Sequence, residues 1–373
     1  MMDSGRAADE RFMALALMLG RRGLGRTWPN PAVGAVVVRD DGAGPVVVGR
    51  GWTHPGGRPH AETQALERAG AAARGATLYV TLEPCSHRGG TPPCVDAIVD
   101  AGIARVVSAL VDPNPQVAGA GHWRLAEQGV TVEVGVGAEA ARRAHAGHLR
   151  RMRDGRPHMV LKLAVSADGK AGLSGRRPAA ITGEPVRARV HQMRAMSDAV
   201  LTGIGTALAD DPLLTCRLPG MADRSPVRVV LDGKLRLPPD GRLVASASTT
   251  PLWVVTWEAA PQECAQALEA RGVQVLRIAS SGGGLDLITA LRLLAERGIT
   301  RTMIEAGPIL CAAFLRSDLV DETVLFRSPN PVGAAGIDAL EGLTLQALTQ
   351  SPRLKSIGRE PIGNDTVEFF ERP

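Results

Sequence analysis

The chain has 373 residues and a net charge of +5, and it is 45% apolar, 22% charged and 3% aromatic. The apolar and charged fractions are those of a folded globular protein and exclude wholesale disorder. Basic residues are spread along the chain, and the few aromatic residues cannot form a platform on which single-stranded nucleic acid stacks, so we expect no nucleic-acid partner.

The first part of the chain alternates between helical and strand patterns. In chain order we expect a helix ending at Gly20, strands at 33–38 and 46–48 around a turn at 40–42, a helix at 61–73, a strand at 77–82, a helix at 94–101, a strand at 106–110, a helix at 122–128 and a strand at 130–134. This alternation predicts an α/β domain. A basic helix at 139–153 follows, and we place the domain boundary there, which gives domains of residues 1–150 and 151–373.

The second part of the chain predicts another α/β domain. We expect helices at 184–196, 261–270, 285–297 and 308–315, and strands at 158–165, 199–203, 227–231, 252–255, 273–278, 301–304 and 322–326. Residues 356–372 have the pattern of a closing hairpin.

Four residues of the first domain have the chemistry of a catalytic zinc site. His60 precedes a predicted helix, while Cys85 follows a predicted strand and Cys94 opens another helix. One imidazole and two thiolates leave the fourth tetrahedral position of zinc free for water, which zinc activates near neutral pH. Glu62 is then placed to carry the proton to a leaving amine, as in the zinc nucleotide-deaminase motif, although eight residues separate these cysteines instead of two.

Glycine-bearing turns end several predicted strands of the second domain, at the edge where ligands gather in open α/β sheets. Gly203, Gly205 and Gly307 could present backbone N–H groups to phosphates, although most such turns are structural. A formal match to the dinucleotide fingerprint at 135–140 is interpreted as a strand-to-helix turn, because the acidic residue at the expected distance, Asp154, lies in a basic loop.

Longer runs around these residues resemble a known family. Four segments resemble the pyrimidine deaminase domain of riboflavin biosynthesis, in which the eight-residue cysteine spacing is normal: 27–34, 59–62, 83–94 and 112–121. Five segments resemble the reductase domain of the same pathway: 161–170, 181–183, 208–217, 304–308 and 319–322. The resemblance covers residues 9–345, and the chain is identified as a member of this bifunctional deaminase–reductase family.

The resemblance implies a cytidine-deaminase-like three-layer αβα domain followed by a dihydrofolate-reductase-like α/β domain. In the first domain it implies one zinc ion at His60, Cys85 and Cys94, Glu62 as the catalytic proton shuttle, and Asn30 at the base or ribose of the substrate. In the second domain it implies NADPH contacts from Ala164, Thr182, Thr206, Asp210 and Gly307, and substrate contacts from Arg194, Asp210, Leu214, Arg217 and Glu305.

The implied reaction has two steps on a small phosphorylated pyrimidine. Zinc-dependent hydrolysis deaminates 2,5-diamino-6-(5-phosphoribosylamino)pyrimidin-4(3H)-one, and NADPH then reduces the ribosyl group to give 5-amino-6-(5-phosphoribitylamino)uracil. A nucleoside or tRNA zinc deaminase with an accessory domain is the alternative, and a ligand-binding protein with a decayed site is a second one. The intact Glu62 and both cysteines argue against the decayed site.

Five positions depart from the family pattern. Many members carry histidine in place of Thr53, a basic residue in place of Gly90, serine in place of Pro178, tryptophan in place of Ala180 and serine in place of Gly233. If the usual side chains contact substrate or cofactor, these departures weaken those contacts.

The sequence also predicts where the protein resides. Its five cysteines are an odd and sparse set, which argues against a disulfide framework and favours a reducing, cytoplasmic compartment. Apolar runs stay short of the roughly 20 residues of a membrane span, so we expect no membrane partner. We expect a homo-oligomer.

Overall fold

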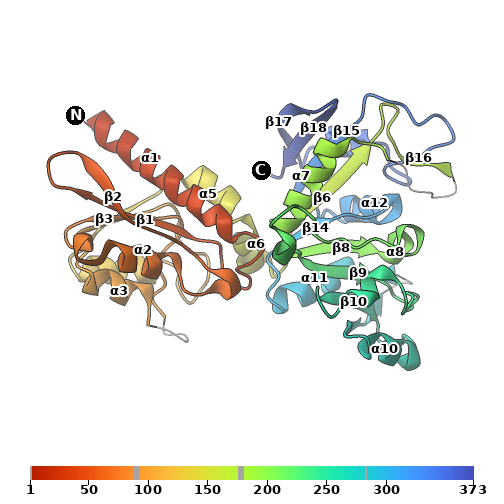
Figure 1. The fold of residues 1–373 in the computed structure, drawn as a ribbon, viewed down its shortest axis with the longest axis horizontal. Helices are drawn as coiled ribbons and strands as arrows, with labels where there is room; N and C mark the ends of the chain where they lie inside the picture. The colour runs from red at the N-terminus through yellow and green to blue at the C-terminus, as the bar shows by residue number, and fades with distance from the viewer. Residues whose placement is uncertain (1, 88–91, 175–179, 282–283) are drawn as a thin grey trace. The chain divides into compact units, whose positions relative to one another are not determined.

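The structure is a computed structural model that describes residues 2–87, 92–174, 180–281 and 284–373 (Figure 1). Gly90 and Pro178 lie outside these residues. The chain forms two compact units, Met1–Gly155 and Arg156–Pro373. Within the described residues, every helix is too short or too polar to cross a membrane.

The first unit is built on a five-stranded sheet in the order β2-β1-β3-β4-β5. Its strands are β1 (Gly34–Asp40), β2 (Pro45–Trp52), β3 (Thr77–Val80), β4 (Arg105–Ser108) and β5 (Thr131–Val134). β1 pairs antiparallel with β2 and β3, and β3, β4 and β5 run parallel. The consecutive buried residues 35–38 of β1 show that both faces of the sheet are covered.

Helices cover both faces of this sheet (Figure 1). On one side lie α1 (Met2–Gly20) and α5 (Ala138–Ala144), and on the other lie α2 (Ala61–Ala69) and α3 (Cys94–Asp100). The unit also contains α4 (Ala120–Glu127) and α6 (Ala146–Asp154). The helix α2 packs directly on β2, because a Cβ at Gly51 would lie 2.1 Å from the carbonyl oxygen of Ala61. Glycine at this position therefore brings the start of α2 against the sheet.

The expected single helix at 139–153 is wrong, because the chain forms two helices that meet at His145. The backbone of His145 leaves the helical range (φ −100°, ψ 13°). Its side chain is buried, and Nε2 lies 2.9 Å from Oγ1 of Thr81 at the end of β3. A polar contact with the core therefore interrupts a helix that the local pattern would continue.

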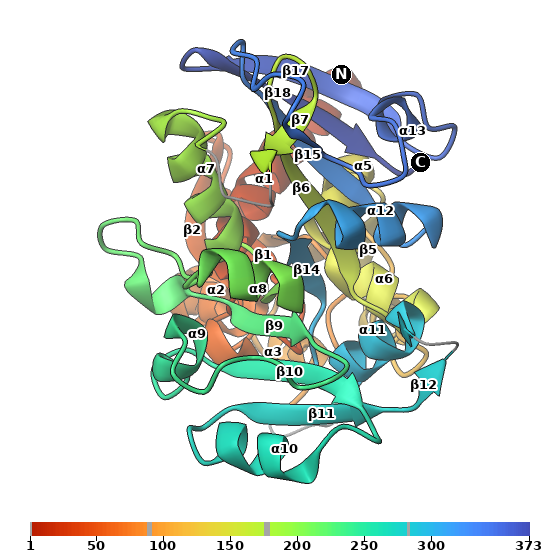
Figure 2. The same ribbon diagram turned by 90° about the vertical axis from the view of Figure 1, so that its right-hand side faces the viewer.

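The second unit is built on a nine-stranded sheet in the order β11-β10-β9-β8-β14-β6-β15-β18-β17 (Figure 2). The first seven strands in this order, from β11 at the edge to β15, are parallel. The terminal hairpin of β17 and β18 then pairs with β15 through β18, in the antiparallel direction. The nine strands are β6 (His158–Val165), β8 (Ala199–Gly203), β9 (Val227–Leu231), β10 (Leu252–Trp257), β11 (Gln274–Ile278), β14 (Arg301–Ile304), β15 (Glu322–Arg327), β17 (Lys355–Ile362) and β18 (Asp365–Glu371).

Seven helices and two short strand pairs complete the described part of this unit. The helices are α7 (Glu184–Ala195), α8 (Ile204–Asp210), α9 (Arg242–Ala245), α10 (Gln262–Glu269), α11 (Leu287–Glu296), α12 (Pro308–Arg316) and α13 (Gln346–Thr349). The pairs are β7 (Lys170–Gly172) with β16 (Ile337–Asp338), and β12 (Ser280–Ser281) with β13 (Gly284–Leu285). The helix α8 occupies a stretch that the sequence pattern left as a glycine turn.

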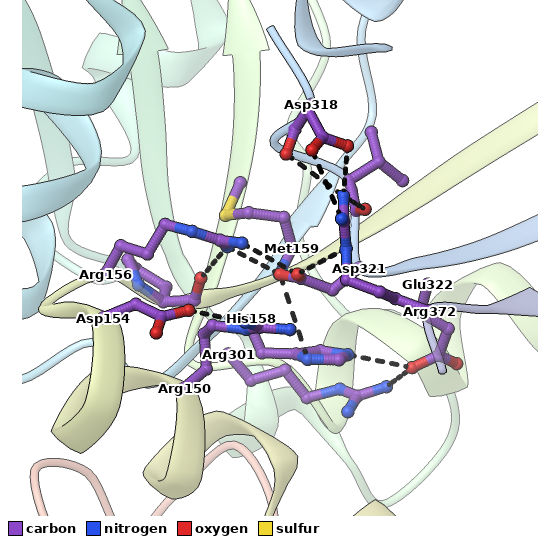
Figure 3. Close-up of polar contacts among 12 residues, drawn as sticks. Arg150, Asp154, Arg156, His158, Met159, Arg301, Asp318, Asp321, Glu322 and Arg372 are labelled. Atoms are coloured by element: carbon purple, nitrogen blue, oxygen red, sulfur yellow. Dashed lines mark hydrogen bonds and ion pairs between the residues drawn. The ribbon is translucent and has the colours of Figure 1, made fainter. Parts of the chain in front are cut away.

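A buried ion pair fixes the amino-terminal edge of this sheet (Figure 3). Arg156 donates to both carboxylate oxygens of Asp321, at 2.6 and 2.8 Å, and the backbone N–H of Met159 donates to the same carboxylate at 2.9 Å. Arg372, on the turn after β18, holds Asp318. These contacts join the start of β6 to the residue before β15. They lie at the amino-terminal ends of these strands, so the carboxyl-terminal ends remain available to form a ligand site.

Candidate active sites

Three candidate metal ligands meet at one edge of the first sheet. His60 immediately precedes α2, Cys85 lies in the segment after β3, and Cys94 is the first residue of α3. Nδ1 of His60 is 3.3 Å from Sγ of Cys94 and 3.6 Å from Sγ of Cys85, and the three ligand atoms lie within 4.8 Å of one another. Zinc bonds of about 2.3 Å to sulfur and about 2.0 Å to nitrogen, at tetrahedral angles, require a nitrogen–sulfur separation of about 3.6 Å. The arrangement therefore fits zinc and leaves one coordination position open.

The two thiols of this cluster share a proton. A hydrogen bond from Cys94 lowers the pKa of Cys85 to about 4, and the backbone N–H of Cys94 also donates to Sγ of Cys85 at 3.3 Å. The same hydrogen bond and burial raise the pKa of Cys94. Cys85 is thus a thiolate at neutral pH, and binding of a metal displaces the remaining proton from Cys94.

Glu62 lies beside the ligands but outside the ligand set. It occupies the first turn of α2 and is 3% exposed. Burial raises the pKa of its carboxyl group, because a buried charge loses its hydration. A carboxyl group with a raised pKa next to a metal centre can take up a proton and return it during one turnover.

Asn30 and Thr53 both serve the backbone around the metal cluster. Asn30 donates from Nδ2 to the carbonyl of Gly57 at 3.1 Å, three residues before His60, so its Oδ1 is the atom left for a ligand. Thr53 is 2% exposed, and its Oγ1 accepts from the backbone N–H of Val33 at 3.0 Å. Thr53 therefore supports the backbone of the segment before β1.

Glu83, two residues before Cys85, has a structural role that its motif does not reveal. Its buried carboxylate accepts four backbone N–H groups from the 112–122 loop, which leads into α4 and includes the first turn of that helix: those of Asp112 (3.0 Å), Gly119 (2.9 Å), Gly121 (2.8 Å) and His122 (3.4 Å). A Cβ at Gly121 would lie 2.2 Å from the carbonyl oxygen of Pro84, so the loop and the metal-binding segment are in close contact. Glu83 therefore joins the 112–122 loop to the segment that carries Cys85.

The second unit has a cavity of about 390 Å³ at the carboxyl ends of β6, β8 and β14. Eight of the residues predicted for the NADPH and substrate sites line it: Ala164, Thr182, Arg194, Thr206, Asp210, Leu214, Glu305 and Gly307. Arg217 is the one predicted residue that is not part of the lining. Lys162 and Arg187 also line the cavity, although the sequence analysis did not assign them to a site.

A partly buried ion pair lines this cavity. Arg194 donates from Nε and a terminal nitrogen to the two carboxylate oxygens of Glu305, at 2.9 and 2.7 Å. Burial would raise the pKa of Glu305, but the charges of Arg194 and Lys162 outweigh it and hold that pKa below its usual value. Most of the Arg194 guanidinium is already engaged, so it is less available to a substrate phosphate than the sequence suggested.

Arg217 stands next to the cavity with a freer side chain. It is exposed, and its terminal nitrogen makes a long contact of 3.5 Å with Oγ1 of Thr215. Burial and the neighbouring charge of Arg194 lower the pKa of Arg217, while Glu305 raises it, so all three groups share one electrostatic environment.

Two predicted NADPH contacts bond to each other. Oγ1 of Thr206 accepts from the backbone N–H of Gly307 at 2.9 Å, which joins α8 to the turn before α12. Asp210 ends α8, and burial followed by the charge of Glu305 raises its pKa. Lys162 makes no hydrogen bond to the described residues, although its charge acts on Glu305, so its amine is available to a ligand in the cavity.

Two of the departures from the family pattern fall in this unit. Ala180 lines the cavity, and its small side chain leaves space that tryptophan would fill. A Cβ at Gly233 would lie 2.8 Å from the ring of Trp257, so that ring occupies the space a serine side chain would need.

Comparison with known proteins covers both units. Residues 6–110 match the model of the cytidine and deoxycytidylate deaminase zinc-binding region, and residues 157–367 match that of the RibD C-terminal domain. The riboflavin biosynthesis protein RibD of Escherichia coli is 40% identical over 370 residues, which cover 96% of this chain and 97% of that protein. RibD of Aquifex aeolicus is 39% identical over 98% of this chain and 99% of that protein.

Solved structures agree with these matches. Acinetobacter baumannii RibD, form 1, has a TM-score of 0.87 and 36% identity over 99% of both chains. A diaminohydroxyphosphoribosylaminopyrimidine deaminase/5-amino-6-(5-phosphoribosylamino)uracil reductase from Thermotoga maritima has a TM-score of 0.84 and 35% identity, over 99% of this chain and 100% of that chain.

Proposed function

The chain belongs to the RibD family of riboflavin biosynthesis proteins, and from that premise we propose how its own residues divide the two reactions. It is a bifunctional enzyme of riboflavin biosynthesis with a zinc-binding deaminase region and a reductase region, which confirms the fold class and activity expected from the sequence. The alternative of a nucleoside or tRNA deaminase does not account for a match that continues through the second unit. We assign deamination to residues 1–150 and reduction to residues 151–373.

The proposed substrate of the first unit is the diaminohydroxyphosphoribosylaminopyrimidine named for the Thermotoga maritima relative. We assign His60, Cys85 and Cys94 as zinc ligands, Glu62 as the catalytic acid and base, and Asn30 as a contact to the base or ribose. Zinc bound there supplies a water activated near neutral pH. Glu62 then accepts the proton of that water and delivers it to the departing amine, so that the carbon gains oxygen and ammonia leaves. The observation that carries this assignment is the raised pKa of the buried Glu62 beside three converging ligands.

The second unit would act on the deaminated product with NADPH, which supplies a hydride to the sugar carbon bonded to nitrogen. That carbon loses its bond to the ring oxygen, and the oxygen needs a proton. Lys162 is placed in the cavity to donate it, because it is cationic and has no hydrogen-bonding partner among the described residues. The remaining proposed contacts are Ala164, Thr182, Thr206, Asp210 and Gly307 to NADPH, and Arg194, Asp210, Leu214, Arg217 and Glu305 to the substrate.

One variant tests both assignments. Glu62→Gln keeps the shape of the side chain and all three ligands, so we expect a full zinc content with ammonia release reduced by a factor of about 10²–10⁴. The same protein, given the deaminated substrate, should oxidise NADPH at the wild-type rate. Ammonia release at the wild-type rate would exclude Glu62 as the proton shuttle, and wild-type protein that does not oxidise NADPH would exclude the reductase assignment.

We also propose that the enzyme is a cytoplasmic homo-oligomer. All five cysteines are free, which fits a reducing compartment. Val46 and Ile357 are exposed apolar residues on the edge strands β2 and β17, where a second copy could pack. Light scattering coupled to gel filtration measures the mass, and a monomer at micromolar concentration would contradict the oligomer.

A further inference from the structure

The loop between α8 and β9 carries the proposed substrate contacts Leu214 and Arg217 and contains two residues with positive φ. Asp211 and Leu214 have positive φ values of 38° and 54°, a range that residues with a bulky side chain rarely adopt. Leu214 is 3% exposed and lines the cavity, and Arg217 follows three residues later. Such a conformation persists only where surrounding contacts fix it.

Two side chains of α7 provide those contacts. His191 and Arg194 are three residues apart and therefore share one face of the helix. Nδ1 of His191 accepts from the backbone N–H of Arg217 at 3.2 Å and lies 3.0 Å from the carbonyl oxygen of Thr215. Arg194 donates to that same carbonyl at 3.0 Å. The helix thus holds the loop by its backbone on both sides of Cys216.

The surroundings of His191 favour the neutral ring over the charged one. Two donors and one acceptor face Nδ1: the backbone N–H of Arg217, a guanidinium N–H of Arg194 at 3.4 Å, and the carbonyl oxygen of Thr215. Nδ1 accepts from these donors when the ring proton is on Nε2 and donates to the carbonyl of Thr215 when the proton is on Nδ1, so His191 contacts the loop backbone in either tautomer. Burial and the charges of Arg194 and Arg217 lower the pKa of His191, which agrees with a neutral ring.

We propose that His191 is a positioning residue of the reductase, which fixes the 211–217 loop so that Leu214 and Arg217 meet the phosphorylated substrate. The proposal rests on the reductase function given above. Because Glu305 fixes Arg194 on the other side, the carboxylate, the arginine, the histidine and the loop form one continuous chain of contacts at the substrate end of the cavity. His191 acts through the backbone of Arg217 and needs no contact with the substrate.

The position of Nδ1 gives a discriminating set of variants. The side-chain amide of asparagine places a polar atom at the position of Nδ1 of histidine, and the amide of the longer glutamine places one at the position of Nε2. Leucine has no polar side-chain atom. We expect His191→Leu and His191→Gln to raise the KM for the deaminated substrate about ten-fold, with the KM for NADPH and the thermal midpoint unchanged. His191→Asn should stay within about two-fold of wild type. Gln192→Leu, on the exposed face of the same helix, is the matched control and should resemble wild type.

Inorganic phosphate provides a second measurement. As a competitor of the substrate, it should lose potency in His191→Leu and His191→Gln by the same factor as the KM rises. The proposal is overturned if His191→Leu keeps the wild-type KM, if asparagine and glutamine behave alike, or if the KM for NADPH rises to the same extent. A wild-type enzyme that does not oxidise NADPH with this substrate would instead remove the proposed function, so the two failures are distinguishable.

Discussion

The buried carboxylate of Glu83 is expected to hold the deaminase loop in place, and Glu83→Gln tests this role. Each carboxylate oxygen accepts two backbone N–H groups, Gly121 and His122 at Oε1 and Asp112 and Gly119 at Oε2. Glutamine replaces one oxygen with an NH₂ group, so two N–H groups of the loop face another donor. A hydrogen bond to a charged acceptor contributes about 1.5–3 kcal/mol. The loss of two, offset in part because a buried charge is removed, destabilises the unit by about 3 kcal/mol.

Heat inactivation measures this effect directly. For a domain of about 150 residues, each kcal/mol lowers the thermal midpoint by about 2–4 °C, so the midpoint should fall by about 6–12 °C. Ammonia release reports on the first unit, and NADPH oxidation by the same sample reports on the second. Only the temperature at which half of the ammonia-releasing activity is lost should fall. Glu67→Gln, an exposed change on α2, should leave both midpoints unchanged.

An unchanged midpoint for ammonia release in Glu83→Gln would refute this reasoning. It would mean that the four N–H groups find other acceptors and that the carboxylate does not fix the loop. A parallel fall in both activities would also contradict it, because the contacts of Glu83 lie within the first unit.

Two further predictions concern other buried and charged groups. Burial lowers the pKa of His145 to about 4 from 6.5, so the unfolded chain binds a proton that the folded chain does not, and stability falls as the pH drops below 6.5. From pH 7 to pH 5 the free energy of unfolding falls by about 2 kcal/mol. Urea unfolding at the two pH values should show a smaller fall in His145→Gln than in the wild type. Equal falls in the two proteins would exclude His145 as the cause. Lys162→Met removes the proposed proton donor with little change in length, so kcat for NADPH oxidation should fall about 100-fold while ammonia release is retained. A kcat within about two-fold of wild type would assign the proton to another group.

The chemistry of the zinc site could be predicted from the sequence alone. A histidine and a cysteine stand at predicted helix starts, a second cysteine follows a predicted strand, and a glutamate lies two residues from the histidine, which limits the chemistry to a few choices. The α/β class of both units could also be predicted, because the alternation of strand and helix patterns is a local property of the chain. The main strands and helices appear in the expected order, and most of their ends agree to within a few residues.

The partners of the charged groups could not be predicted from the sequence. Arg194 and Glu305 are 111 residues apart, and nothing in either local pattern indicates that they neutralise each other. Glu83 was visible as part of a motif, but its role depends on N–H groups that the 112–122 loop presents only when folded. His145 breaks a helix because its ring reaches a threonine 64 positions away.

The sequence thus determined which chemistry this protein can carry, and the tertiary structure decided which polar groups are free to perform it. Residue types and their periodicity along the chain follow from the sequence, so the fold class and the candidate zinc ligands could be identified there. The availability of a charge depends on what lies opposite it in the folded protein. Most of Arg194 is taken up by Glu305 and Thr215, whereas Lys162 has no such partner among the described residues. Side chains become buried and paired only when segments far apart in the sequence meet in the fold. These contacts decide whether a charged side chain is held in a structural role or is available to bind a ligand.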